Sequence, residues 1–153
     1  IAPHLTDPSS IAEVCARFRN GITFSSIKSG IQHERNVLII DNIGMLSRLY
    51  HYADITYVGG GFGAGIHNTL EAIAFGAPVI FGPNYKKFRE ARALIEAGGG
   101  FSINNHQELN AIVEKLILDE HLRNQIGQRN KQFIADNSGA ADKIISYLKH
   151  SGL

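Results

Sequence analysis

The residues with the clearest chemical potential form one stretch, Gly59–Glu71, which reads G-G-G-F-G-A-G-I-H-N-T-L-E. Five of its first seven residues are glycine, so the backbone can adopt positive φ angles and its N–H groups can lie close to a ligand. An apolar run, residues 55–58, precedes the stretch, and a helical pattern, residues 68–75, follows it. The first turn of a helix has N–H groups without partners at the positive end of the helix dipole. The stretch therefore predicts a binding site for a phosphate or a carboxylate.

Three other interpretations of the glycine-rich stretch fit its residues less well. A tight structural crossover without a ligand would need only small or apolar residues, yet His67, Asn68 and Glu71 stand at the helix start. A dinucleotide fingerprint belongs to the first strand of its domain and needs an acidic residue at the end of the next strand, and neither condition is met. A P-loop is excluded because no Lys-Ser/Thr pair follows the glycines.

The elements that must position this stretch alternate between short apolar runs and helical patterns. We expect strands at 1–3, 22–25, 37–40, 55–58, 78–81 and 101–103 and helices at 8–18, 45–52, 68–75, 88–97, 106–118, 120–135 and 140–149, with 26–36 irregular or at a sheet edge. Short connections between such units favour parallel strands. The sequence therefore predicts an α/β fold, a single Rossmann-like three-layer domain with a mostly parallel sheet.

Four polar loops follow predicted strands. They are Pro3–His4, Asp41–Gly44, Gly59–Asn68 and Gly82–Lys87. Ligands of open α/β sheets bind outside the carboxyl ends of the strands. We therefore expect these four loops to converge on one edge of the sheet.

Composition sets the limits on function. The chain has 153 residues, of which 44% are hydrophobic and 19% charged, and its formal net charge is +1. This is enough for one domain with a core, and the weak charge gives no reason to expect nucleic acid as a partner. The single cysteine excludes an internal disulfide and a multi-cysteine zinc site, and no apolar run approaches the ~20 residues that span a bilayer. The chain opens without Met, on Ile1–His4, which we interpret as a fragment of a longer protein.

Four segments in order carry a family resemblance. They read D-N-I-G-M-L (41–46), Y-x-x-A-D-I-x-x-V-G-G (50–60), G-I-H-N-x-L-E-A (65–72) and G-A-P-V-I-F-G-P (76–83). They resemble the donor-binding half of GT-B glycosyltransferases, and in particular the 3-deoxy-D-manno-octulosonic acid (Kdo) transferases of lipopolysaccharide assembly. The resemblance spans about residues 1–103, and the later helices agree in type only.

The resemblance implies that residues 1–153 are the C-terminal nucleotide-sugar-binding domain, one half of a GT-B fold whose N-terminal acceptor domain is missing. It implies CMP-Kdo as the donor, lipid A or its precursor as the acceptor, and inverting transfer without a metal or another cofactor. The catalytic base would lie in the missing domain, so no catalytic residue is expected here and the fragment alone is predicted to be inactive. The full-length protein would associate with the cytoplasmic face of the bacterial inner membrane, and the fragment would be soluble.

The resemblance also suggests roles in the site. The N–H groups from Gly60 to Asn68 would face the phosphate, Glu71 would accept hydrogen bonds from ribose hydroxyls, and the Ile43–Gly44 backbone would form the cytosine wall. Favourable placement in the first helical turn is the alternative for Glu71, and an ordinary turn is the alternative for Ile43–Gly44. The complete expected substrate-binding set is Pro3, His4, Ile43, Gly44, Gly60, Gly61, Phe62, Gly63, Gly65, His67, Asn68, Glu71 and Lys87.

Several positions depart from the family pattern. Pro3-His4 stands where the family has Pro-Arg, and Met45, Gly61 and Lys87 stand where it has Glu, Ser and Asn. These departures indicate a divergent branch. The alternatives are a GT-B domain for a UDP- or GDP-sugar, a non-catalytic nucleotide-binding module, and an epimerase of GT-B architecture.

Overall fold

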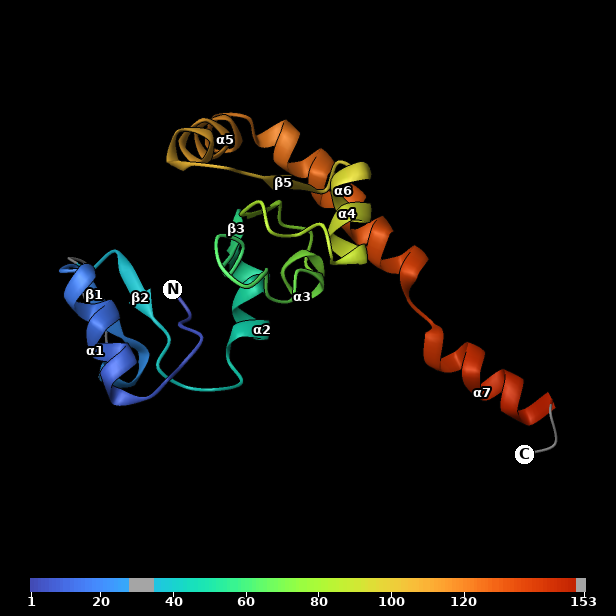
Figure 1. Cartoon of the computed structure of the whole chain (residues 1–153), viewed down its shortest axis with the longest axis horizontal. Coiled ribbons are helices and arrows are strands. Elements are labelled where there is room, and N and C mark those ends of the chain that lie inside the picture. The colour runs from blue at the N-terminus through green and yellow to red at the C-terminus, as the bar shows by residue number, and fades with distance from the viewer. Residues whose placement is uncertain (28–34, 151–153) are drawn as a thin grey trace. The chain divides into compact units, whose positions relative to one another are not determined.

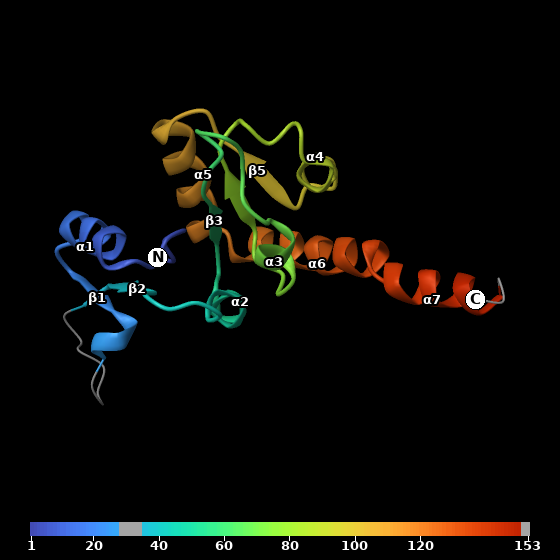
Figure 2. The ribbon, with the colours of Figure 1, turned by 60° about the horizontal axis from the view of Figure 1, so that its bottom comes forward.

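The computed structural model describes residues 1–27 and 35–150. They divide into two compact units, Ile1–Leu49 and Tyr50–Leu153, and each unit is described by itself. Figure 1 labels most of the elements along the chain, and Figure 2 shows the same ribbon from a second direction.

The first unit is built around two short parallel strands. Helix α1 (Pro8–Arg17) leads to β1 (Gly21–Thr23) and a 3₁₀ turn, η1 (Phe24–Ser26), and β2 (Val37–Ile39) leads to α2 (Leu46–Leu49). The two strands pair in parallel, with Gly21 opposite Val37. Asp7 caps α1, since its carboxylate accepts a hydrogen bond from the Ser10 N–H at 3.0 Å.

The expected strand at residues 1–3 is not a strand in the structure. Ile1 still lies beside β2, because its ammonium group donates to the Leu38 oxygen at 2.6 Å and its own oxygen accepts from the Ile40 N–H at 2.8 Å. Pro3 has no N–H to continue such a ladder, which explains why the pairing stops. The segment expected to be irregular, 26–36, lies mostly outside the described residues.

The second unit contains a three-stranded parallel sheet. Its strands are β3 (Thr56–Val58), β4 (Val79–Phe81) and β5 (Gly100–Ser102), in that spatial order. Helix α3 (Leu70–Ile73) lies in the first crossover and α4 (Arg89–Glu96) in the second. A 3₁₀ turn, η2 (Tyr50–Tyr52), precedes the sheet, and α5 (His106–Leu118), α6 (Glu120–Asn137) and α7 (Ala140–His150) follow it.

Helices cover both faces of this sheet, as a three-layer domain requires. All three residues of β4 are buried, and alternate side chains of a strand point to opposite faces. Val79 and Phe81 pack in one core cluster with residues of α3 and α4, and Ile80 packs in a second cluster with residues of α5 and α6. The α/β class with parallel strands is therefore confirmed.

Other details of the sequence-based expectation also differ from the structure. The described strands form two parallel sheets in place of one, and each strand is only three residues long. Helix α3 begins at Leu70 and not at Asn68, because the Asn68 side-chain oxygen accepts from the Leu70 N–H at 3.0 Å and holds the preceding residues outside the helix. Among the described helices, none combines the length and apolar character of a membrane span.

Candidate functional site

The glycine-rich loop, residues 59–68, follows β3 directly. Gly60 and Gly65 have φ angles of 86° and 137°, a region that residues with a side chain rarely occupy. A Cβ atom on Gly60 would lie 2.2 Å from the Gly65 oxygen. These two positions therefore require glycine for the fold of the loop.

Several backbone N–H groups of the glycine-rich loop donate hydrogen bonds within the loop. The N–H groups of Gly63 and Gly65 both donate to the Gly60 oxygen, at 2.9 and 3.2 Å, and the His67 N–H donates to the Gly59 oxygen at 3.3 Å. These three N–H groups are therefore not available to a ligand, and fewer donors remain in Gly60–Asn68 than the sequence predicts. The amides of Phe62 and Ala64 are not among these internal donors.

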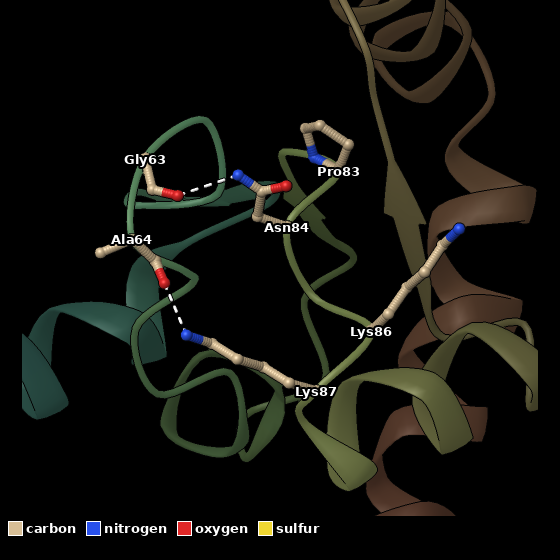
Figure 3. A pocket seen from close by; sticks show the side chains of 6 residues that line it. All are labelled: Gly63, Ala64, Pro83, Asn84, Lys86 and Lys87. Atoms are coloured by element: carbon tan, nitrogen blue, oxygen red, sulfur yellow. Dashed lines mark hydrogen bonds between the residues drawn. The ribbon is translucent and has the colours of Figure 1, made fainter.

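A second loop, residues 82–87 after β4, holds the glycine-rich loop in place. The backbone N–H of Asn84 donates to the Gly61 oxygen at 2.9 Å, and its side-chain Nδ2 donates to the Gly63 oxygen at 2.8 Å. The Lys87 ammonium donates to the Ala64 oxygen at 2.6 Å (Figure 3). The predicted convergence of these two loops is therefore observed.

Close backbone packing joins the two loops as well. A Cβ atom on Gly61 would lie 2.5 Å from the Gly82 nitrogen, and one on Gly82 would lie 2.6 Å from the Gly61 carbonyl carbon. Gly61 does not have a positive φ angle. Its glycine is therefore required by the approach of Gly82 and not by its own backbone conformation.

The two loops line a pocket of about 330 Å³. Its walls are Gly63, Ala64, Pro83, Asn84, Lys86 and Lys87 (Figure 3). Main-chain polar groups, one amide side chain and two lysines therefore surround the space. The Asn84 and Lys87 side chains of this lining donate to the Gly63 and Ala64 oxygens, and the Lys86 side chain points away from both (Figure 3).

Two polar side chains at the start of α3 form a pair. Asn68 Nδ2 donates to Glu71 Oε1 at 2.8 Å, and both residues are exposed. The Asn68–Glu71 pair thus offers a carboxylate, oriented by Asn68, that can accept hydrogen bonds from hydroxyl groups. Burial and the negative charge of Glu71 also raise the pKa of the Tyr50 hydroxyl above its usual value.

Two further residues border this part of the loop. The His67 ring lies beside Gly60, since a Cβ atom on Gly60 would lie 3.3 Å from His67 Nε2. Thr69 is only 1% exposed, and its Oγ1 has no hydrogen-bond partner among the described residues. No group of three or more metal-ligating side chains occurs in the described ranges.

Four residues of the expected set belong to the first unit. Pro3 is half-buried and His4 is exposed, while the Ile43 side chain is 90% exposed and Gly44 has a φ angle of 91°. Their participation in the site stays a prediction. Sequence reasoning missed Asn84 as a site residue, although its place directly after Gly82-Pro83 at the end of a buried strand was a usable signal.

Comparison with known proteins gives these loops a context. The family model described as "Glycosyl transferases group 1" matches residues 26–133. A 3-deoxy-D-manno-octulosonic acid transferase of Haemophilus influenzae is 34% identical over 116 residues, which cover 74% of this chain and 27% of the relative. The enzyme of the same name from Aquifex aeolicus is 40% identical over 78 residues, which cover 50% and 22%. That from Chlamydia trachomatis serovar D is 32% identical over 133 residues, which cover 84% and 31%.

A solved structure confirms the fold. The C-terminal CMP-Kdo binding domain of WaaA from Acinetobacter baumannii superposes with a TM-score of 0.72 at 20% identity, over 84% of this chain and 69% of that one. The matched part of this chain spans less than a third of the length of each of the three relatives above. Because the family model covers more than half of the chain, the chain belongs to the glycosyl transferases group 1 family, and it has the fold of that CMP-Kdo binding domain.

Proposed function

We propose that the chain is the C-terminal, donor-binding domain of a Kdo transferase and that its donor is CMP-Kdo. The observation that carries the proposal is the contact between the glycine-rich loop and residues 82–87, with the Asn68–Glu71 pair at the next helix start. The names of the relatives and of the similar solved domain support the choice of sugar.

The chemistry of the donor agrees with these groups. CMP-Kdo carries a phosphodiester and a sugar carboxylate, which are both negative, and ribose hydroxyls, which are donors. Backbone N–H groups of a glycine-rich turn bind phosphate oxygens. An ionised Glu71 is an acceptor only and therefore suits the ribose hydroxyls. Asn68 already uses its Oδ1 on Leu70 and one N–H on Glu71, so one N–H is left for a phosphate oxygen.

The remaining steps belong to the whole protein. In our proposal the Kdo unit is transferred, with inversion at the anomeric carbon, to lipid A or its precursor. The base that activates the acceptor hydroxyl comes from a domain outside this chain. The lipid acceptor would bring the full-length protein to the cytoplasmic face of the inner membrane.

The test is nucleotide binding to the full-length protein, measured by calorimetry with CMP, UMP and GMP. We expect CMP to bind most tightly. Glu71→Ala and Asn68→Ala should each weaken CMP binding by about tenfold or more, because each removes a hydrogen bond that involves a charged group. Glu96→Ala is the matched control, since Glu96 is exposed on α4, and it should leave the affinity unchanged.

The rival functions predict other results. Tighter binding of UMP or GMP would favour a UDP- or GDP-sugar as the donor. CMP binding without any Kdo transfer to lipid A would favour a non-catalytic nucleotide-binding module. Unchanged CMP affinity in both the Asn68 and the Glu71 variant would remove the site assignment.

A further inference from the structure

We propose that Asn84 and Lys87 form a latch that fixes three peptide groups of the glycine-rich loop. Asn84 orients the two that carry the N–H groups of Phe62 and Ala64, which serve as the phosphate donors, and Lys87 holds the Ala64–Gly65 peptide and so keeps the loop closed. The identity of the anion rests on the proposed function. The latch itself rests only on contacts within the protein.

The latch consists of three hydrogen bonds to nearby carbonyl groups. Asn84 donates from its backbone to the Gly61 oxygen and from its side chain to the Gly63 oxygen, at 2.9 and 2.8 Å. Lys87 donates to the Ala64 oxygen at 2.6 Å. Three of the four carbonyl groups from Gly61 to Ala64 are thus directed at the 82–87 loop.

The direction of these carbonyls fixes the direction of the N–H groups. A trans peptide is planar, and its C=O and N–H point in opposite directions. The Gly61 carbonyl shares a peptide with the Phe62 N–H, and the Gly63 carbonyl shares one with the Ala64 N–H. Both N–H groups therefore point away from residues 82–87. The Gly65 N–H, which follows the Ala64 carbonyl, is already used by the Gly60 oxygen, so Phe62 and Ala64 supply the donors.

A second contact, beside the hydrogen bond to the Ala64 oxygen, holds the Lys87 side chain near the loop. Its ammonium lies 5.3 Å from the centre of the Phe88 ring, an arrangement of attractive cation–π contact. Phe88 packs against the core cluster of the sheet. A Cβ atom on Gly65 would lie 2.9 Å from Lys87 Cε and 2.8 Å from the Phe88 ring. The missing side chain at Gly65 thus allows Lys87 to reach the loop.

The chain offers a matched control in Lys86. It carries the same charge and lines the same pocket, but its side chain points away from Gly63 and Ala64 (Figure 3). Lys86→Met removes the same charge as Lys87→Met without touching the latch. Lys87→Arg keeps a cationic donor of similar reach and should rescue the loss.

The first measurement is hydrogen exchange of the full-length protein without nucleotide, followed by mass spectrometry. The amides of Gly63 and Gly65 are hydrogen-bonded inside the closed loop, so their exchange reports its opening. Lys87→Met and Asn84→Ala should each raise loop exchange by about two- to tenfold, the worth of one exposed hydrogen bond, whereas Lys86→Met should not. Equal exchange in Lys87→Met, Asn84→Ala and the parent would overturn the latch.

The second measurement is CMP affinity of the same proteins. It should fall in Lys87→Met and Asn84→Ala by about the factor seen in exchange, and Lys87→Arg should restore it. Faster exchange with unchanged affinity, in a parent that binds CMP, would overturn the assignment of Phe62 and Ala64 as donors. A parent that does not bind CMP would refute the proposed function, whereas the exchange result would still decide the latch.

Discussion

Asn130 should be the most costly polar side chain to remove from the second unit. It is fully buried in α6, and its Nδ2 donates to the Ala77 oxygen at 2.8 Å and to the Gly99 oxygen at 3.0 Å. It thereby ties α6 to the residues just before β4 and just before β5. Asn130→Ala removes two buried hydrogen bonds, leaves two carbonyls without this donor and opens a cavity; the removal of the Asn130 Oδ1, which is buried without a partner among the described residues, offsets part of this loss. The expected loss is about 2–4 kcal/mol of unfolding free energy.

The assay is denaturant unfolding of the parent and variants followed by circular dichroism, with thermal melting in parallel. A loss of this size lowers Tm by about 4–16 °C for a protein of this length. Asn124→Ala is the matched control, because Asn124 is exposed on the same helix, and it should change stability by less than about 0.5 kcal/mol. If Asn130→Ala costs no more than Asn124→Ala, the reasoning is refuted.

Two further predictions concern the loops. Gly61→Ala should lower the free energy of unfolding by about 1–3 kcal/mol through overpacking, because the new Cβ would lie 2.5 Å from the Gly82 nitrogen. Gly63→Ala is the control, since a Cβ on Gly63 meets nothing closer than 3.7 Å. Chemical unfolding of both alanine variants checks this, and equal losses of stability would contradict it. Hydrogen bonds from the Ser25 hydroxyl and from the Ser25 backbone N–H hold the pKa of Asp41 below its usual 3.8. The stabilising contribution of Asp41 is therefore present above that value and is lost as the pH falls through the lower folded-state pKa. Stability measured from about pH 5 to 2 should therefore fall less steeply in Asp41→Asn than in the parent, and equal slopes would speak against the effect.

Local sequence signals predicted most element types correctly. Helix α5 has the predicted bounds, His106–Leu118, and begins at a cap in which Asn105 accepts from the Glu108 N–H at 2.9 Å. The run Pro78–Phe81 reads as a buried strand and is one, because β4 is covered on both faces. Because caps and apolar runs depend on residues that are close in the sequence, they can be recognised without the tertiary structure.

The boundaries of α3 could not be obtained in the same way. The periodicity of residues 68–75 is helical, but Asn68 uses its side chain on the Leu70 backbone and on Glu71. Asparagine competes with the helix for backbone donors in this manner. The spacing of apolar residues does not reveal this competition, so the predicted helix starts too early.

The sequence by itself determined that a glycine-rich loop follows a buried strand and that polar residues stand at the next helix start. It also determined the family resemblance, because ordered motifs are a property of the chain. Only the tertiary structure decided which glycines are needed for φ and which for close approach, since Gly61 depends on Gly82, 21 positions away in the printed sequence. It also decided which amides remain for a ligand. Hydrogen bonds from Asn84 and Lys87 set the peptide planes of the loop, and such long-range contacts leave no periodic trace in the sequence.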